Sequence, residues 1–180
     1  MPIWLWLTVI IGVALLTAAL VVLAFLGWRA WERRLLLKLV VRAEAADAVG
    51  AAFYDIVKSV SDAQAADFDA FVSDPNSTER RALAEVRERS RLMVEELDHL
   101  ALPRRFVRVA EALADAAHVV VDEVDTVEEA VAGEEPGALL MAVDLSRVRA
   151  YAQRARLLLT DACKELGLED TAVYGGGLYL

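Results

Sequence analysis

Residues 3–28 read IWLWLTVIIGVALLTAALVVLAFLGW and contain no charged side chain. About 20 apolar residues are enough to cross the ~30 Å hydrocarbon core of a bilayer, and this stretch would reach about 39 Å as a helix. Thr8 and Thr17 are its only polar side chains apart from the tryptophan ring N–H groups, whereas a helix of a soluble protein carries a polar face. The stretch therefore predicts a membrane-spanning helix.

The residues on either side of this stretch favour an anchor that stays on the protein. Trp4 and Trp6 lie at one end and Trp28 and Trp31 at the other, which is typical of aromatic rings at the two membrane–water interfaces. A cleaved signal peptide has a basic first region, a shorter apolar run and a small-residue cleavage site. Here two uncharged residues precede the run and no A-x-A follows it. We expect residues 1–31 to form an uncleaved anchor.

Basic residues predict the orientation of the anchor. Five of them lie within residues 29–42, opposed only by Glu32. Because basic residues favour the cytoplasmic side, we expect a single-pass protein of the plasma membrane with its N-terminus outside and its C-terminal domain in the cytoplasm. The residues expected at the membrane interface are Trp4, Trp6, Trp28, Arg29, Trp31, Arg33 and Arg34.

Charge separates the rest of the chain from this basic segment. The formal net charge is −9, and residues 43–180 hold 14 basic against 27 acidic residues. An acidic domain disfavours nucleic-acid binding, which needs a basic surface. Eight arginines between residues 80 and 108 alternate with glutamates. We interpret them as a solvated face with i,i+4 pairs such as Arg81–Glu85 and Glu85–Arg89.

The segments after the anchor have helical periodicity throughout. No turn signal separates the anchor from the stripe that follows, so one helix is expected to continue to about Ser59. A short helix over residues 62–72 would use Ser61 as its N-cap with Gln64 as the capping-box partner. Asn76 and Glu79 form a second capping box, for a helix whose buried stripe is Leu83, Val86, Ser90, Met93, Leu97 and Leu100.

Two further helices complete the predicted domain. Pro103 suits the first position of one helix, which would end at Gly133. The last would run from Leu139 to a stop at Gly167. Short connections make successive helices antiparallel neighbours. We therefore predict an all-α protein: a single N-terminal transmembrane helix continuous with a cytoplasmic antiparallel four-helix bundle over residues 32–168, followed by a glycine-rich tail over residues 169–180.

Motifs that suggest chemistry are weak. Residues 96–99 read E-x-x-H and residues 115–118 read D-x-x-H, as in carboxylate-bridged metal sites. With a turn near Pro103, however, His118 would lie roughly 22 Å beyond the level of His99, too far for one metal ion. Cys163 falls on an apolar stripe and is expected to be a small buried residue. We expect no metal, no cofactor and no enzymatic activity.

The tail ends in three glycines followed by apolar residues. It could be a tethered recognition peptide that adds a strand to a partner, or it could fold back on the bundle or be disordered. Its candidate partner-binding residues are Tyr174, Leu178, Tyr179 and Leu180. We expect a non-enzymatic scaffold or accessory subunit that contacts the lipid bilayer and another membrane or cytoplasmic protein. The alternative is a self-assembling structural homo-oligomer, and an enzyme is the least supported class.

Overall fold

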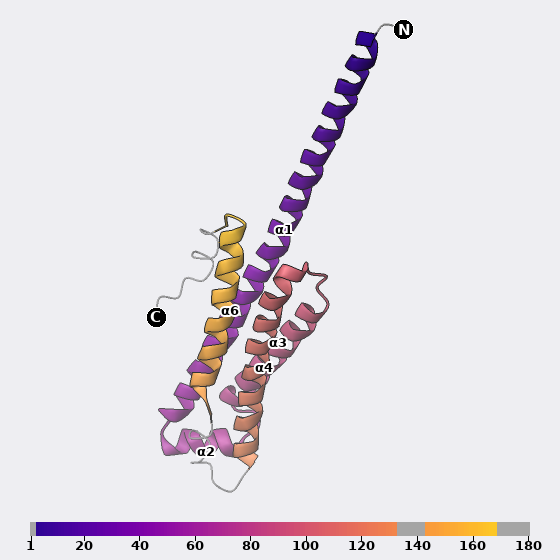
Figure 1. The fold of residues 1–180 in the computed structure, drawn as a ribbon. Coiled ribbons are helices and arrows are strands. Elements are labelled where there is room, and N and C mark those ends of the chain that lie inside the picture. The colour runs from indigo at the N-terminus through magenta and orange to yellow at the C-terminus, as the bar shows by residue number, and fades with distance from the viewer. Residues whose placement is uncertain (1–2, 133–142, 169–180) are drawn as a thin grey trace. The chain divides into compact units, whose positions relative to one another are not determined.

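The computed structural model describes residues 3–132 and 143–168 of the chain. Within those residues it contains five helices and no strand, which confirms the all-α prediction. The chain divides into two compact units, residues 1–37 and 38–180, with the boundary inside the first helix. The helices are α1 (Ile3–Ser61), α2 (Ala65–Ser73), α3 (Thr78–Asp98), α4 (Arg104–Ala132) and α6 (Leu145–Glu165) (Figure 1).

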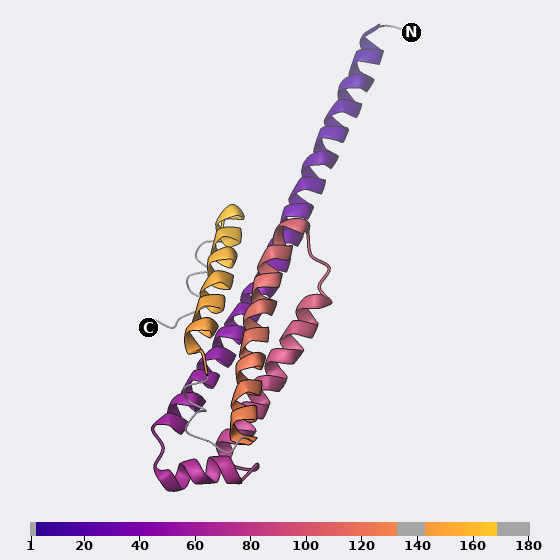
Figure 2. The same ribbon diagram turned by 60° about the horizontal axis from the view of Figure 1, so that its bottom comes forward.

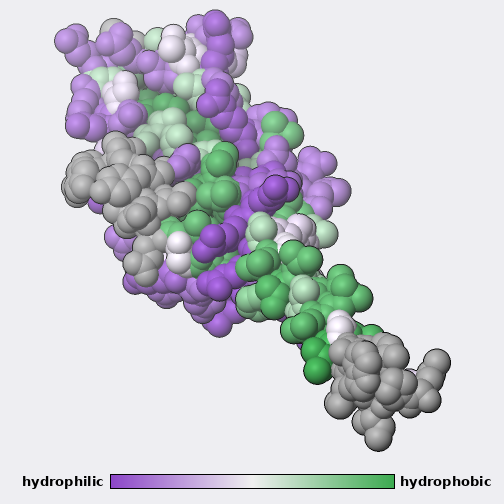
Figure 3. Space-filling model, turned by 90° about the horizontal axis from the view of Figure 1, so that it is seen from above, coloured by the Kyte–Doolittle hydropathy of each residue, from purple (hydrophilic) through white to green (hydrophobic). Residues whose placement is uncertain are grey.

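Helix α1 is a single helix of 59 residues, as expected from the absence of any helix-ending signal. Every side chain from residue 10 to residue 31 is exposed, and Figure 3 shows a nearly continuous hydrophobic surface along this apolar segment. In the described part of the chain, α1 is the one helix long and apolar enough to cross a membrane. A signal sequence near an N-terminus has a comparable length and apolar composition.

Helix α2 starts later than predicted. Ser61 is the last residue of α1 and its hydroxyl donates to the carbonyl of Lys58 at 2.8 Å. It therefore cannot cap the next helix, and the predicted helix over residues 62–72 is wrong in its first three residues. Gln64 is the N-cap of α2 and makes no capping hydrogen bond through its side chain. Helix α2 runs crosswise to the longer helices of its unit (Figures 1 and 2).

The N-cap of α3 is Ser77 rather than Asn76. The Ser77 hydroxyl accepts the Arg80 N–H at 3.4 Å, while Asn76 donates its own N–H to the Asp74 carboxylate at 2.8 Å. The predicted capping box fails because Asn76 belongs to the preceding turn. Pro103 was predicted at the first position of its helix but lies just before it, because α4 begins at Arg104. The Pro103 carbonyl accepts the Phe106 N–H at 2.8 Å, as the carbonyl of a cap residue does.

The start of α6 was also placed too early. Asp144 is non-helical and caps the helix by accepting the Arg147 N–H at 3.0 Å, so the helix begins at Leu145 and not at Leu139. Leu139 itself, like the predicted stop of α4 at Gly133, lies outside the described residues.

The predicted stop at Gly167 is confirmed. Gly167 has φ of 65°, a conformation that glycine adopts without a Cβ penalty. The N–H of Leu168 donates to the Cys163 carbonyl at 2.9 Å, and the N–H of Gly167 donates to the Lys164 carbonyl at 3.1 Å. These two bonds form the Schellman motif that satisfies the last carbonyls of a helix.

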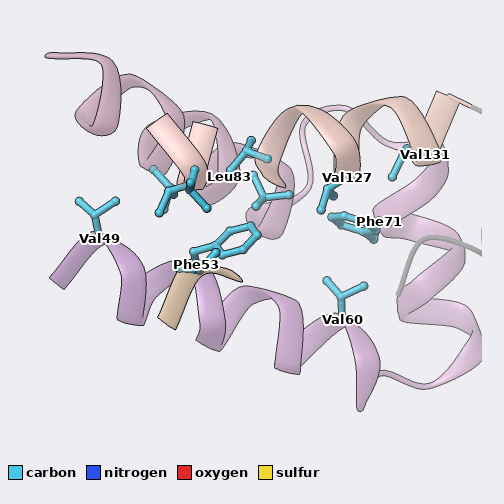
Figure 4. Packing of buried hydrophobic residues seen from close by; sticks show 12 residues of the cluster. Val49, Phe53, Val60, Phe71, Leu83, Val127 and Val131 are labelled. Carbon is cyan, nitrogen blue, oxygen red and sulfur yellow. The ribbon is translucent and has the colours of Figure 1, made fainter. Parts of the chain in front are cut away.

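The hydrophobic core of the second unit joins all five helices. Figure 4 shows Phe53 of α1 pointing toward Leu83 of α3, and Phe71 of α2 beside Val127 and Val131 of α4. Phe53 is fully buried. Helix α4 packs against both α3 and α6, and its buried face is mostly valine and alanine. These short side chains allow close approach of the helices.

Ion pairs connect the same helices at the surface. Arg87 of α3 reaches Asp125 at 2.8 Å and Glu128 at 2.7 Å on α4. Arg156 of α6 bonds the Asp47 carboxylate of α1 at 2.6 Å. The α3–α4 and α1–α6 contacts are thus reinforced by charge, each contributing modestly because the partners are partly solvated.

Candidate functional site

The expected membrane-interface residues lie on α1. Trp6, Trp28 and Trp31 are exposed, and the rings of Trp28 and Trp31 form a tilted pair with centroids 5.1 Å apart. Arg29, Arg33 and Arg34 are exposed on the turns that follow. The side chain of Trp4 lies outside the described residues. The described side chains provide aromatic and basic groups at one end of an apolar helix, the chemistry that an interface requires.

A cavity of about 50 Å³ lies among α1, α3, α4 and α6, and we call it the Ser90 pocket. Its walls are largely small or aliphatic side chains, among them Gly50 of α1, Ala116 of α4 and Ala155 of α6. Small residues let helices approach at the level of the backbone, but they leave space where their side chains are too short to meet. The pocket follows from this composition.

Ser90 is the neutral polar side chain of the pocket. It is fully buried on the inner face of α3 between Val86 and Met93, and its hydroxyl has no hydrogen-bond partner among the described residues. A hydroxyl within a helix can bond the carbonyl four residues earlier, as those of Thr126 and Thr160 do at 2.9 and 2.8 Å. An unsatisfied buried hydroxyl costs about 1–3 kcal/mol. Sequence reasoning placed Ser90 in the buried stripe but attached no role to it.

Charged groups lie where the pocket reaches solvent. Asp47 and Arg156, joined by their 2.6 Å ion pair, line the pocket together with Glu44. Glu44 and Arg156 are exposed, so this side of the pocket is its mouth. The Asp47 and Arg156 charges neutralise each other, which leaves the interior apolar apart from the Ser90 hydroxyl.

A second polar cluster joins α4 to the start of α6. The carboxylate of Glu123, a buried residue, accepts the Asp144 N–H at 2.9 Å and faces the Arg147 guanidinium at 3.4 Å. Arg147 also bonds Asp122 at 3.1 Å. Hydrogen bonds from the Ser146 hydroxyl and then from the Arg147 N–H lower the pKa of Asp144 from its ordinary value.

Sequence reasoning missed Glu123, although a signal was present. Glu123 follows Val120 by three residues and precedes Val127 by four, so it shares their helical face. A carboxylate at such a position is buried only when it has a partner. The nearer partner here is the backbone N–H of Asp144, at 2.9 Å, and no sequence pattern reveals it.

The other reactive side chains are not brought together. His99 Nδ1 lies 2.7 Å from the carbonyl of Glu95 in its own helix, and His118 is exposed. In the described ranges no three His, Cys, Asp or Glu side chains are gathered as metal ligands. Cys163 is fully buried, as predicted, and desolvation raises the pKa of its thiol. The tail residues Tyr174, Leu178, Tyr179 and Leu180 lie outside the described residues.

The arginine-rich segment corresponds in part to the predicted face of paired charges. Arg89 pairs with Glu85 one turn earlier, as expected. Arg81 instead donates its Nε to the Asn76 carbonyl at 2.9 Å, a contact outside the predicted i,i+4 pair. Arg87 pairs with Asp125 and Glu128 of α4, so it belongs to the α3–α4 contact and not to the solvated face.

Comparison of the chain with protein-family models, with curated proteins and with solved structures finds no match.

Proposed function

We propose that this protein is a membrane-anchored, non-enzymatic helical domain that binds another protein at the cytoplasmic face of the plasma membrane. The observation that carries the proposal is the exposure of the apolar part of α1: none of its most apolar 18 residues is buried by the rest of the chain. Burying such a surface in hydrocarbon is strongly favourable. A bilayer supplies that environment along the full length of the segment.

The orientation rests on the basic residues after the apolar segment. Arg29, Arg33 and Arg34 are exposed and would lie among anionic headgroups of the inner leaflet. The acidic domain that follows is repelled by the same leaflet and remains in the cytoplasm. Its acidic surface suits a partner with a basic patch, since complementary charge increases the rate and specificity of encounter.

The domain itself is proposed to be an antiparallel four-helix bundle of the cytoplasmic part of α1 with α3, α4 and α6. The ion pairs between α4 and α6 support this direction. Asp115 pairs with Arg154 at 3.8 Å, and Asp122, seven residues later on α4, pairs with Arg147, seven residues earlier on α6. Such opposite progression is expected only of antiparallel neighbours.

Membrane insertion is tested by one charged substitution. Leu16→Arg places a charge at the middle of the apolar segment, which costs roughly 2.5–3.5 kcal/mol on insertion scales. We expect the variant to be largely extracted by alkaline carbonate while the wild type stays in the membrane pellet. Leu157→Arg is the matched control because Leu157 is an equally exposed leucine on α6. Extraction of the wild-type protein itself would overturn the proposal.

Orientation and partner binding need separate measurements. A reporter enzyme that is active only in the cytoplasm, fused after Leu180, should be active; an inactive fusion with an active exported-form reporter would reverse the orientation. Crosslinking in native membranes followed by purification should recover a second protein in stoichiometric amount. Recovery of crosslinked copies of this chain alone, with a matching mass by light scattering, would favour self-assembly instead.

A further inference from the structure

We propose that the Ser90 pocket is a binding site for a small neutral amphiphile, with an apolar body of a few atoms and one hydroxyl group that hydrogen-bonds Ser90. The proposal does not depend on the membrane anchor. It rests on the size of the pocket, on the chemistry of its walls and on a buried hydroxyl without a partner.

The volume sets the size of the guest. A water molecule occupies about 30 Å³ in the liquid, and a cavity of about 150 Å³ binds benzene. The Ser90 pocket, at about 50 Å³, lies between the two and would take roughly two to four non-hydrogen atoms. An ethanol-sized molecule fits this range, whereas a nucleotide, a sugar or a complete lipid does not.

The walls set the polarity of the guest. Met93, Leu113 and Val120 face the pocket with carbon and sulfur atoms, so a charged guest would lose its hydration without compensation. Ser90 Oγ can both donate and accept one hydrogen bond at a buried position. A hydroxyl offers the same two functions, and it would satisfy Ser90 while its alkyl part contacts the aliphatic walls.

Gly50 contributes backbone to the pocket wall. It lies in the interior of α1, and a Cβ built on it would meet nothing within 4 Å. Glycine there is less favourable than alanine by about 0.5–1 kcal/mol, and no neighbouring atom excludes a methyl group.

Methionine methyl NMR of the full-length protein in lipid nanodiscs tests the proposal. The chain has three methionines, of which Met93 lines the pocket. Ethanol is the probe, and xenon is the apolar guest of comparable size. We expect the Met93 signal to shift saturably with ethanol, with a dissociation constant on the order of millimolar or weaker for so few atoms.

Two variants separate hydroxyl recognition from simple filling of space. Ser90→Ala should weaken ethanol binding about fivefold, the value of one ordinary hydrogen bond, and leave xenon binding unchanged. Ala116→Val adds two methyl groups to a buried side chain of the pocket wall and should weaken binding of both guests. Ser59→Ala and Ala45→Val are the controls, because Ser59 and Ala45 are exposed and neither lines the pocket.

Three results would overturn the proposal. Ethanol binding that is unchanged in Ser90→Ala would remove hydroxyl recognition. A Met93 shift that grows linearly with ethanol and does not saturate would mean that the pocket takes water at most. Unchanged binding in Ala116→Val would place the guest elsewhere. Thermal melts of each variant verify that the fold is kept.

Discussion

The buried carboxylate of Glu123 offers a direct test of how α6 is held to α4. In Glu123→Ala the Asp144 N–H loses the acceptor that lies 2.9 Å away. A hydrogen bond to a charged group is worth about 1.5–3 kcal/mol, and the lost methylene groups add to this. The contact with Arg147 is long, at 3.4 Å, and Arg147 keeps its bond to Asp122, so it adds little. We expect a total loss of about 3 kcal/mol.

Glu123→Gln separates the shape of the side chain from its charge. The glutamine amide oxygen can still accept the Asp144 N–H, so the expected loss is only about 1 kcal/mol. Glu129→Ala is the control, because Glu129 is exposed on the same helix, and surface substitutions stay within about 0.5 kcal/mol.

Urea unfolding of the full-length protein in detergent micelles provides the measurement. Loss of helical circular dichroism gives the midpoint and, by linear extrapolation, the free energy of unfolding. If Glu123→Ala unfolds within 0.5 kcal/mol of the wild type, or if Glu123→Gln costs as much as the alanine variant, the carboxylate does not hold α6 in the way described.

Four further substitutions follow from the packing, the caps and the backbone conformation. Phe53→Ala removes a fully buried ring and should cost about 3–5 kcal/mol in the same urea assay; a loss under 1 kcal/mol would contradict the described core. The lowered pKa of Asp144 means that its stabilisation is present above the unfolded-state pKa and is lost as pH falls through the folded-state value. Asp144→Asn should therefore flatten the acid limb of the stability–pH curve, and an unchanged limb would rule out this contribution. Gly167→Ala should cost about 1 kcal/mol because φ there is positive, whereas Gly50→Ala should gain about 0.5–1 kcal/mol; equal signs for the two would refute the backbone argument.

Sequence periodicity predicted the helices well because each buries a long stripe. The first helix was predicted to end at about Ser59 and ends at Ser61. The buried stripe of α3 was correct at Leu83, Val86, Ser90, Met93 and Leu97. Helix starts were less accurate. Asn76 and Ser77 are both good caps, and only the backbone conformation decides between them.

The candidate site was harder to predict than the helices. The Ser90 pocket depends on the spacing of four helices, and small residues in a sequence do not distinguish a close contact from a space. Glu123 depends on one backbone N–H twenty-one residues away. Both features depend on tertiary contacts, whereas the apolar segment of α1 and the glycine at position 167 can be recognised from the local sequence.

The Asp47–Arg156 pair has a consequence for biosynthesis. Its residues are 109 positions apart, and a ribosome adds roughly 5–20 residues per second. On the order of 5–20 s therefore pass between the synthesis of Asp47 and the synthesis of Arg156. During that time the apolar face of α1 that will line the pocket is accessible to chaperones and to other nascent chains. Helix α6 supplies the last residues that line the pocket, so truncation before Leu145 leaves this face of α1 without its α6 neighbour.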